Sequence, residues 1–286
     1  MLRRLRESAH TKVQNALRDV LDERRSADRE VLRAELAATR EQLTAEVVRV
    51  RADLGGELGA ARDQLAKALV DLEWRQRRDL YFAAEVRAAA ESEAFVLQHM
   101  PTVPSFPHPY DTLRFGVGEV AVGGMALEFG VATGATLRII AEGTPGRPVH
   151  GFDVFTGLPE DWRTGFGAGS FAQAQLPEVD GVELVVGLFA DTLPAFLTEH
   201  PGPVALLHLD ADLYSAAVTV FDLVGPRLVE GSVIVFDEYF NYPGWQDGEH
   251  KAWSEFVERT AAQFDYLGYT FDHEQLVVRI TRAPQR

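Results

Sequence analysis

Acidic residues follow two apolar runs of strand length in the second half of the chain. The first run, Val-Ala-Leu-Leu-His-Leu, ends at Asp210, with Asp212 two residues further on, and the second, Ser-Val-Ile-Val-Phe, ends in Asp237 and Glu238. Uninterrupted apolar runs are typical of parallel strands that are buried on both faces. Converging carboxylates repel one another unless a proton or a cation intervenes, and hard divalent cations such as Mg²⁺ prefer oxygen ligands. These acids are therefore candidate metal ligands.

The stretch between the two runs sets how the acids are positioned. Residues 218–229 have helical periodicity, and Gly231 is expected to end that helix. A strand–helix–strand unit with the usual right-handed crossover makes its two strands parallel. The acids then lie at the carboxyl ends of strands in one sheet, which is where open α/β sheets bind ligands.

An earlier apolar strand leads into a glycine turn. Gly130 and Gly134 follow it, and residues 137–142 are predicted to form a helix. Glycines let the backbone approach a ligand, and a helix N-terminus offers free N–H groups. The spacing Gly-x-x-x-Gly does not fit the Gly-x-Gly-x-x-Gly dinucleotide fingerprint, which disfavours an NAD-dependent enzyme. Glu128, two residues before the first glycine, suits a ligand with a cationic centre or hydroxyl groups.

Two further acids are candidate ligand contacts. Asp153 ends the next predicted strand, about 20 residues beyond the glycine turn, where an acid hydrogen-bonds ribose hydroxyls in doubly wound folds. Its alternative role is a helix cap. Asp191 begins a predicted helix, and both an N-cap role and a contact to adenine remain open.

Loops beside these strands carry aromatic residues. The glycine-rich loop 155–171 has the length of a lid or a binding loop. Residues 239–245 are aromatic and polar and suit stacking on a sugar or an aromatic ring. His208 is interpreted as a core histidine, whereas His250 and Lys251 are candidates on the side of a second substrate.

Composition excludes several classes of protein. The chain has no Cys, so disulfides and Cys-ligated zinc are excluded. The net charge of −15 lies entirely in residues 96–286, because residues 1–95 hold equal numbers of basic and acidic residues. Such an acidic surface repels phosphate backbones, so nucleic acid is not an expected partner. We expect neither a membrane span nor a signal peptide, and cytoplasmic location is the default.

Residues 1–95 contain no Pro and are rich in strong helix formers. Two sets of apolar residues repeat every seven positions, one position out of phase across Gly55-Gly56: Leu36, Leu43 and Val50, then Leu58, Leu65 and Leu72. One interpretation is a coiled coil with a skip that assembles copies of the chain into a homo-oligomer. The other is a helix that packs on the rest of the protein or is partly disordered.

Three separated motifs together resemble a known family. They are Gly151-Phe-Asp-x-Phe-x-Gly-Leu-Pro, Leu209-Asp-Ala-Asp-Leu-Tyr214 and Phe236-Asp-Glu-Tyr-Phe-Asn-Tyr-Pro-Gly-Trp245. In order and spacing they are similar to the macrocin O-methyltransferase family within the class I S-adenosylmethionine-dependent methyltransferases. Glu128-Phe-Gly-Val-x-x-Gly134 resembles the first cofactor motif of that class.

The resemblance covers about residues 112–282 and implies their architecture, whereas the helical extension at residues 1–95 is expected from composition and periodicity. We expect a doubly wound α/β fold with a mostly parallel, seven-stranded sheet and a long N-terminal helical extension. The expected division is a helical extension at 1–95, a Pro-rich connector or lid at 96–111, and a catalytic domain at 112–286.

The resemblance also implies a function and a site. It implies methylation of a hydroxyl on a sugar, a sugar-containing natural product or a glycan, with S-adenosylmethionine and Mg²⁺. The implied metal ligands are Asp210, Asp237 and Glu238, and we assign Asp210 as general base as well. The expected cofactor contacts are Glu128, Gly130, Thr133, Gly134, Asp153 and Asp191.

Two other functions remain open at this point. Leu209-Asp-Ala-Asp-Leu-Tyr214 also resembles the Asp-x-Asp motif of Mg²⁺-dependent haloacid-dehalogenase-type phosphatases, although that motif normally opens its domain. A third hypothesis is a non-catalytic coiled-coil scaffold that carries a degenerate methyltransferase domain. Removal of residues 1–95, followed by assays of catalysis and assembly, separates the scaffold from the enzyme.

Overall fold

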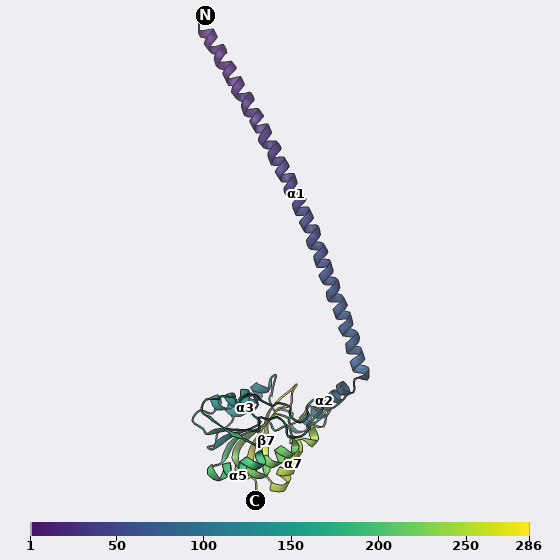
Figure 1. Cartoon of the computed structure of the whole chain (residues 1–286), viewed down its shortest axis with the longest axis vertical. Helices are drawn as coiled ribbons and strands as arrows, with labels where there is room; N and C mark the ends of the chain where they lie inside the picture. The colour runs from purple at the N-terminus through teal and green to yellow at the C-terminus, as the bar shows by residue number, and fades with distance from the viewer. Residues whose placement is uncertain (1, 286) are drawn as a thin grey trace. The chain divides into compact units, whose positions relative to one another are not determined.

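The structure is a computed structural model that describes residues 2–285, with side chains from residue 10 onward. It divides into two units between Arg77 and Arg78. The first is a single long helix, drawn in purple and blue in Figure 1, and the second is a globular body built on a sheet. We call the second unit, from Arg78 onward, the globular body.

The helices and strands alternate through most of the globular body. The long α-helices are α1 (Leu2–Arg78), α2 (Leu80–His99), α3 (Pro109–Gly118), α4 (Ala135–Gly143), α5 (Phe189–Glu199), α6 (Tyr214–Val224) and α7 (Glu249–Thr260), with short 3₁₀ turns η1 (Gly225–Arg227) and η2 (Trp245–Asp247). The strands are β1 (Ser105–Phe106), β2 (Met125–Phe129), β3 (Val149–Asp153), β4 (Val182–Val186), β5 (Val204–Leu209), β6 (Leu228–Phe236), β7 (Gln263–Thr270) and β8 (Leu276–Arg282).

The strands form one sheet, in the order β1-β7-β8-β6-β5-β2-β3-β4 over the described residues. β4, β3, β2, β5 and β6 are parallel, and β8 pairs antiparallel with both β6 and β7. The strand order reverses between β2 and β5, which is the switch point where doubly wound sheets bind ligands. The expected doubly wound, mostly parallel fold is confirmed, and the two-residue β1 adds an eighth strand at the edge.

Helices cover both faces of the sheet. In β6, Ile234 and Phe236 pack in a core with residues of α5, α6 and α7, whereas Val233 and Val235 pack on the other face with residues of α3 and α4. All four side chains are fully buried. Burial on both faces explains why the central strands are continuously apolar instead of alternating.

Two boundaries differ from the sequence predictions. Gly231 does not end a helix: α6 ends at Val224, and Gly231 lies inside β6 with φ +88°. The sequence pattern was ambiguous there because the apolar spacing of a short strand and of a helix turn overlap. α3 begins at Pro109, inside the connector predicted at 96–111, with His108 as N-cap: its Nδ1 accepts from the Tyr110 N–H at 3.2 Å.

The second helix belongs to the globular body rather than to an extension ending at residue 95. Ser92 of α2 is buried, and its Oγ accepts a hydrogen bond from the backbone N–H of Asn241 at 2.8 Å. The ring of Phe95 lies against those of Tyr239 and Trp245, with centroids 6.0 and 5.6 Å away. The structural boundary therefore lies near residue 78.

In the part of the chain that the structure describes, no helix is both long and apolar enough to span a membrane.

Candidate functional site

A cavity of about 620 Å³ opens at the carboxyl ends of the parallel strands. It is bordered by residues that follow four neighbouring strands: Gly130 after β2, Asp153 at the end of β3, Gly187 after β4 and Asp210 after β5. Asp237 and Glu238, after β6, complete this border. Its volume lies within the range of small-molecule and cofactor sites.

The glycine turn is held in place by Asp153. Its Oδ2 accepts from the N–H groups of Val131 and Ala132 at 2.9 and 2.8 Å, and its Oδ1 accepts from the N–H of Phe155 at 2.6 Å. An ionised carboxylate has about four acceptor positions, so Asp153 retains capacity for a ligand hydroxyl. The acid therefore shapes the turn and borders the cavity at the same time.

Gly130 is required by its neighbour on the next strand. Its φ is +94°, and a Cβ at this position would overlap the backbone carbonyl of Asp210. The backbone at the end of β2 thus lies very close to the backbone at the end of β5, and this contact places the glycine turn directly beside the acidic cluster.

Three carboxylates gather at one end of the cavity. Asp210, Asp212 and Glu238 each offer an oxygen, and these three oxygens lie within 4.8 Å of one another. Asp212 has φ +56°, in the left-handed region, which turns the chain sharply after β5. Of the implied metal ligands, Asp210 and Glu238 belong to this trio, whereas Asp237 borders the cavity outside it.

The trio is held in an environment that disfavours charge. Burial, followed by the negative charge of Asp237, raises the pKa of both Asp210 and Glu238 well above the ordinary value. The same two causes raise the pKa of Asp212 to about 7, with Arg163 opposing them. A bound cation would offset this repulsion, and Glu238 Oε2 is buried without a hydrogen-bond partner among the described residues.

Glu249, at the start of α7, is a site residue that the sequence analysis missed. It is fully buried, and its two oxygens accept from the N–H groups of Ala211 at 3.3 Å and Glu238 at 3.2 Å. It therefore ties together the chain just after β5 and the chain just after β6. An acid in the first turn of a helix is common on a protein surface, so the sequence carried no signal for this role.

Glu128 lies beneath the cavity instead of bordering it. It is fully buried, and its Oε1 is 2.9 Å from Nδ1 of His208, which is itself 1% exposed. Nε2 of His208 lies 3.9 Å from Asp237 Oδ1. Although burial opposes protonation, the hydrogen bond and charge of Glu128 raise the pKa of His208. Glu128 thus partners a core histidine and does not meet the cavity where a cofactor contact was expected.

Three other predicted contacts also lie outside the cavity lining. Thr133 is exposed, and Gly134, with φ +73°, is the N-cap of α4 and packs against Pro177. Asp191 is exposed in the first turn of α5, whose N-cap is Leu188. The helix begins two residues earlier than predicted, which places Leu188, Phe189 and Ala190 at the cavity instead.

The glycine-rich loop 155–171 is folded against the globular body. Arg163 donates to both oxygens of Glu274 at 3.0 and 2.9 Å, and its guanidinium lies 4.0 Å from the Trp162 ring centroid and 4.7 Å from that of Tyr242. Residues at both ends of the loop border the cavity. Glu274, on the turn before β8, was not among the sequence candidates.

The two candidates on the acceptor side have packing roles. The His250 ring lies 5.6 Å from that of Phe95 and 4.8 Å from that of Trp245, inside the contact with α2. Lys251 Nζ lies 4.4 Å from the Tyr214 ring centroid. Neither residue borders the cavity.

Comparison with known proteins identifies the domain. Residues 127–239 match the family model described as a methyltransferase domain. This span runs from β2 through the end of β6 and so includes the glycine turn, Asp153 and the acidic cluster. Among curated proteins, no sequence relative matches the chain.

Several solved structures resemble the chain over part of its length, all with TM-scores under 0.5. The calicheamicin methyltransferase CalS11 is 26% identical, with 59% of this chain and 76% of that chain covered and a TM-score of 0.46. The O-methyltransferase NovP is 22% identical over 60% and 79%, with a TM-score of 0.47. An O-methyltransferase from Bacillus cereus, solved with S-adenosylhomocysteine, is 17% identical over 75% and 97%, with a TM-score of 0.42.

The matched span and the strand order agree on one assignment. The glycine turn, the acid that ends β3 and the acidic cluster all lie within the matched residues, at the switch point of a doubly wound sheet. Residues 127–239 of the globular body therefore form a methyltransferase domain with a doubly wound, Rossmann-like fold.

Proposed function

We propose that this enzyme transfers the methyl group to a hydroxyl oxygen of a sugar, a sugar-containing natural product or a glycan, with the help of Mg²⁺. The observation that carries the proposal is the trio of carboxylate oxygens from Asp210, Asp212 and Glu238 at the cofactor cavity. Transfer to a neutral hydroxyl requires removal of its proton, and a cation with a neighbouring carboxylate is suited to that task.

The cavity fits the cofactor in size and in chemistry. The ends of β2 and β3 supply Gly130 and Asp153, and α5 supplies the apolar side chain of Phe189. Backbone N–H groups and a carboxylate suit the hydroxyls of a ribose, and apolar side chains suit an adenine ring. The acidic lining also suits the positive sulfonium centre of S-adenosylmethionine.

The acidic trio fits Mg²⁺, because all three ligands are oxygen donors and Glu238 Oε2 is buried without a partner among the described residues. When bound there, Mg²⁺ would offset the repulsion among the acids and lower the pKa of an acceptor hydroxyl. Asp237, beside the trio, is the fourth candidate ligand.

Two residues are candidates for the general base. Asp210 is our sequence-based assignment, and its carboxylate belongs to the trio and borders the cavity. Asp212 is the competing candidate, because its carboxylate also belongs to the trio and borders the cavity. The other carboxylate then serves as a ligand only.

Phe171 of the glycine-rich loop borders the cavity, and its ring suits an acceptor with a sugar face. The rings of Trp162 and Phe166 lie near that of Phe171. Aromatic rings stack on the apolar faces of sugars and of planar rings. The restriction to sugars rests on the resemblance of the three motifs.

Calorimetric titration of S-adenosylhomocysteine into the full chain, with Mg²⁺ or with EDTA, tests the site. We expect micromolar binding that is weakened at least tenfold in Phe189→Ala. The exposed Asp191→Asn is the matched control and should bind as the wild type does. NAD serves as the ligand control.

An acceptor screen with sugars, nucleotide-linked sugars and simple phenols then tests the reaction. We expect methyl transfer that needs Mg²⁺ and falls at least 100-fold in Glu238→Gln. Asp210→Asn and Asp212→Asn separate the two base candidates, because loss of the base lowers kcat at all Mg²⁺ concentrations, whereas loss of a ligand is partly rescued by more Mg²⁺. Full activity in EDTA would contradict the metal-assisted proposal.

A further inference from the structure

The long helix α1 carries a repeat of eleven residues. Its 77 residues form one unbroken helix that passes through Gly55 and Gly56, where the two heptad sets change phase. A leucine recurs every eleven residues along it: Leu21, Leu32, Leu43, Leu54 and Leu65. Each of these leucines is 49% to 63% exposed. A single repeat therefore accounts for both heptad sets without a skip.

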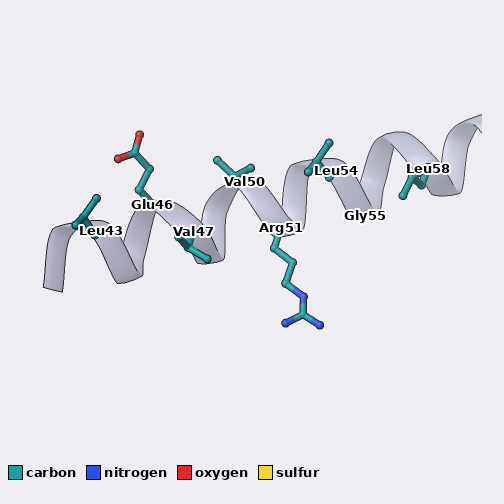
Figure 2. A pocket seen from close by; sticks show the side chains of 8 residues that line it. All are labelled: Leu43, Glu46, Val47, Val50, Arg51, Leu54, Gly55 and Leu58. Atoms are coloured by element: carbon teal, nitrogen blue, oxygen red, sulfur yellow. The ribbon is translucent and has the colours of Figure 1, made fainter. Parts of the chain in front are cut away.

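The same repeat produces two more columns beside the leucines, and their residues are apolar except Thr39. Four residues after each of the last four leucines stand Leu36, Val47, Leu58 and Leu69, and three residues after those stand Thr39, Val50, Ala61 and Leu72. Eleven residues make three turns of about 3.67 residues, close to the 3.6 of a relaxed helix. The columns thus form one nearly straight stripe with a slight right-handed drift. The middle of the stripe is a shallow apolar groove on one helix, shown in Figure 2.

Opposite charges line the two sides of the stripe. Arginines stand eight residues after each of the first four leucines: Arg29, Arg40, Arg51 and Arg62. Glutamates stand three residues after Leu32, Leu43 and Leu54: Glu35, Glu46 and Glu57. At about 100° per residue, the arginines lie roughly 80° around the helix to one side of the leucines, and the glutamates lie roughly 60° to the other side. Figure 2 shows Glu46 and Arg51 pointing to opposite sides of the helix. Glu46 also lies 3.9 Å from Arg49, but exposed ion pairs of this kind contribute little.

This charge arrangement distinguishes between orientations of two paired copies. When two identical helices pair in parallel, the two-fold axis runs along them, and the left side of one stripe meets the right side of the other. The arginine column of each copy then faces the glutamate column of its partner. In an antiparallel pair, like sides meet, so arginines face arginines and glutamates face glutamates. Like charges directly opposite each other repel.

We propose that α1 is a self-association helix that pairs, parallel and in register, with α1 of a second copy of this chain. In register, every leucine of the eleven-residue repeat meets the same leucine of the partner, which buries the stripe. The two globular bodies are then attached at the same end of the pair. This inference is independent of the methyl acceptor and of the metal.

The mass of the full chain in solution tests the association. Sedimentation equilibrium should give at least a dimer at micromolar concentration. Leu43→Glu with Leu54→Glu places charges in the stripe and should give a monomer. Ala45→Glu with Ala52→Glu adds the same charge on the opposite, exposed face and should leave the assembly intact. A monomeric wild type, or a leucine double variant that still assembles, would overturn the proposal.

The orientation has its own test because the chain contains no Cys. We expect Leu32→Cys and Leu54→Cys, each made alone, to form a disulfide-linked dimer on mild oxidation, since like positions meet in a parallel pair. The two positions are 22 residues apart, about 33 Å along a helix. An antiparallel pair has one centre, so at most one of these variants could cross-link to itself. Cross-linking at only one position would refute the parallel arrangement.

A charge exchange tests the flanking columns without touching the leucines. Arg40→Glu with Arg51→Glu makes both sides of the stripe acidic and should weaken association at least tenfold at low salt. Adding Glu35→Arg and Glu46→Arg restores opposite charges on the two sides of the stripe and should restore assembly. No rescue in the fourfold variant, with helix content unchanged by circular dichroism, would remove the argument for parallel pairing.

Discussion

At the scale of single residues, the site depends on carboxylates with different tasks. Asp153 and Glu249 accept backbone N–H groups and hold the chain turns in place, whereas Asp210, Asp212 and Glu238 present oxygens toward one another. Acids that are satisfied by backbone donors act as structural supports. Acids that repel one another at a cavity are the ones that need a cation or a proton.

Glu249→Ala should destabilise the protein by about 2 to 4 kcal/mol, because two backbone N–H groups lose their acceptor in a buried place. Urea unfolding measures this loss. The exposed Glu258→Ala on the same helix is the matched control and should change stability by less than about 0.5 kcal/mol. An equal effect of the two substitutions would show that Glu249 has no anchoring role.

Glu274 should make stability depend on pH. Burial raises its pKa from 4.5 to about 7, while Arg163 opposes the shift. The folded state then keeps a proton that the unfolded state releases, so the stabilisation is complete below about pH 4.5 and is lost as the pH rises to about 7.

Comparison of the wild type with Glu274→Gln isolates this dependence. Glutamine does not titrate, so the variant should gain about 2 to 3 kcal/mol relative to the wild type between pH 5 and pH 8. Urea unfolding in EDTA at both pH values measures it. If the stability of the variant relative to the wild type instead falls as the pH rises, then Arg163 stabilises the ionised carboxylate more than burial destabilises it.

At the scale of elements, the glycine turn between β2 and α4 depends on its contact with the end of β5. The turn has a left-handed glycine at Gly130 because the Asp210 carbonyl occupies the space that a side chain would need. The same contact brings the cofactor turn and the acidic cluster together. The glycine turn and the acidic cluster are thus coupled through the backbone.

Gly130→Ala should therefore cost more than about 2 kcal/mol of stability and abolish S-adenosylhomocysteine binding, because it combines positive φ with steric overlap. Gly123→Ala is the matched control, since a Cβ there has open space and φ is not positive. Thermal unfolding and calorimetry measure both effects. Wild-type binding by Gly130→Ala would show that the two strand ends can separate without loss of the site.

At the scale of the whole molecule, the chain consists of a globular body and a helix with separate structural requirements. The body has hydrophobic cores on both faces of its sheet, and its secondary structure from α2 onward is tied in by buried contacts. Among the side chains described from residue 10 onward, those of α1 contribute nothing to either hydrophobic core, and its large apolar side chains are exposed. Catalysis and assembly can thus be altered independently.

A protein that lacks residues 1–77 should keep its melting temperature within about 3 °C and bind S-adenosylhomocysteine as the full chain does. It retains Asp79, whose carboxylate caps α2. It should also be monomeric if α1 carries the assembly. Differential scanning calorimetry and sedimentation measure these outcomes. A truncated protein that fails to fold would show that the helix supports the body.

The local pattern of the sequence determined the strand ends, the acids that follow them and the helical nature of α1. These features depend on neighbours in the chain, on apolar run length and on periodicity, which are visible without the fold. The resemblance of three motifs added the identity of the cofactor.

Only the tertiary structure decided which acids share a task. Glu128 pairs with His208 across β2 and β5, Glu249 reaches the ends of β5 and β6 from α7, and Glu274 meets Arg163 from 111 positions away. Carboxylates are alike in sequence, and what separates a candidate metal ligand, a turn anchor and a buried partner is the direction of the side chain and its burial. The direction and the burial of a side chain are set by residues distant in the chain, so the local sequence pattern does not predict them.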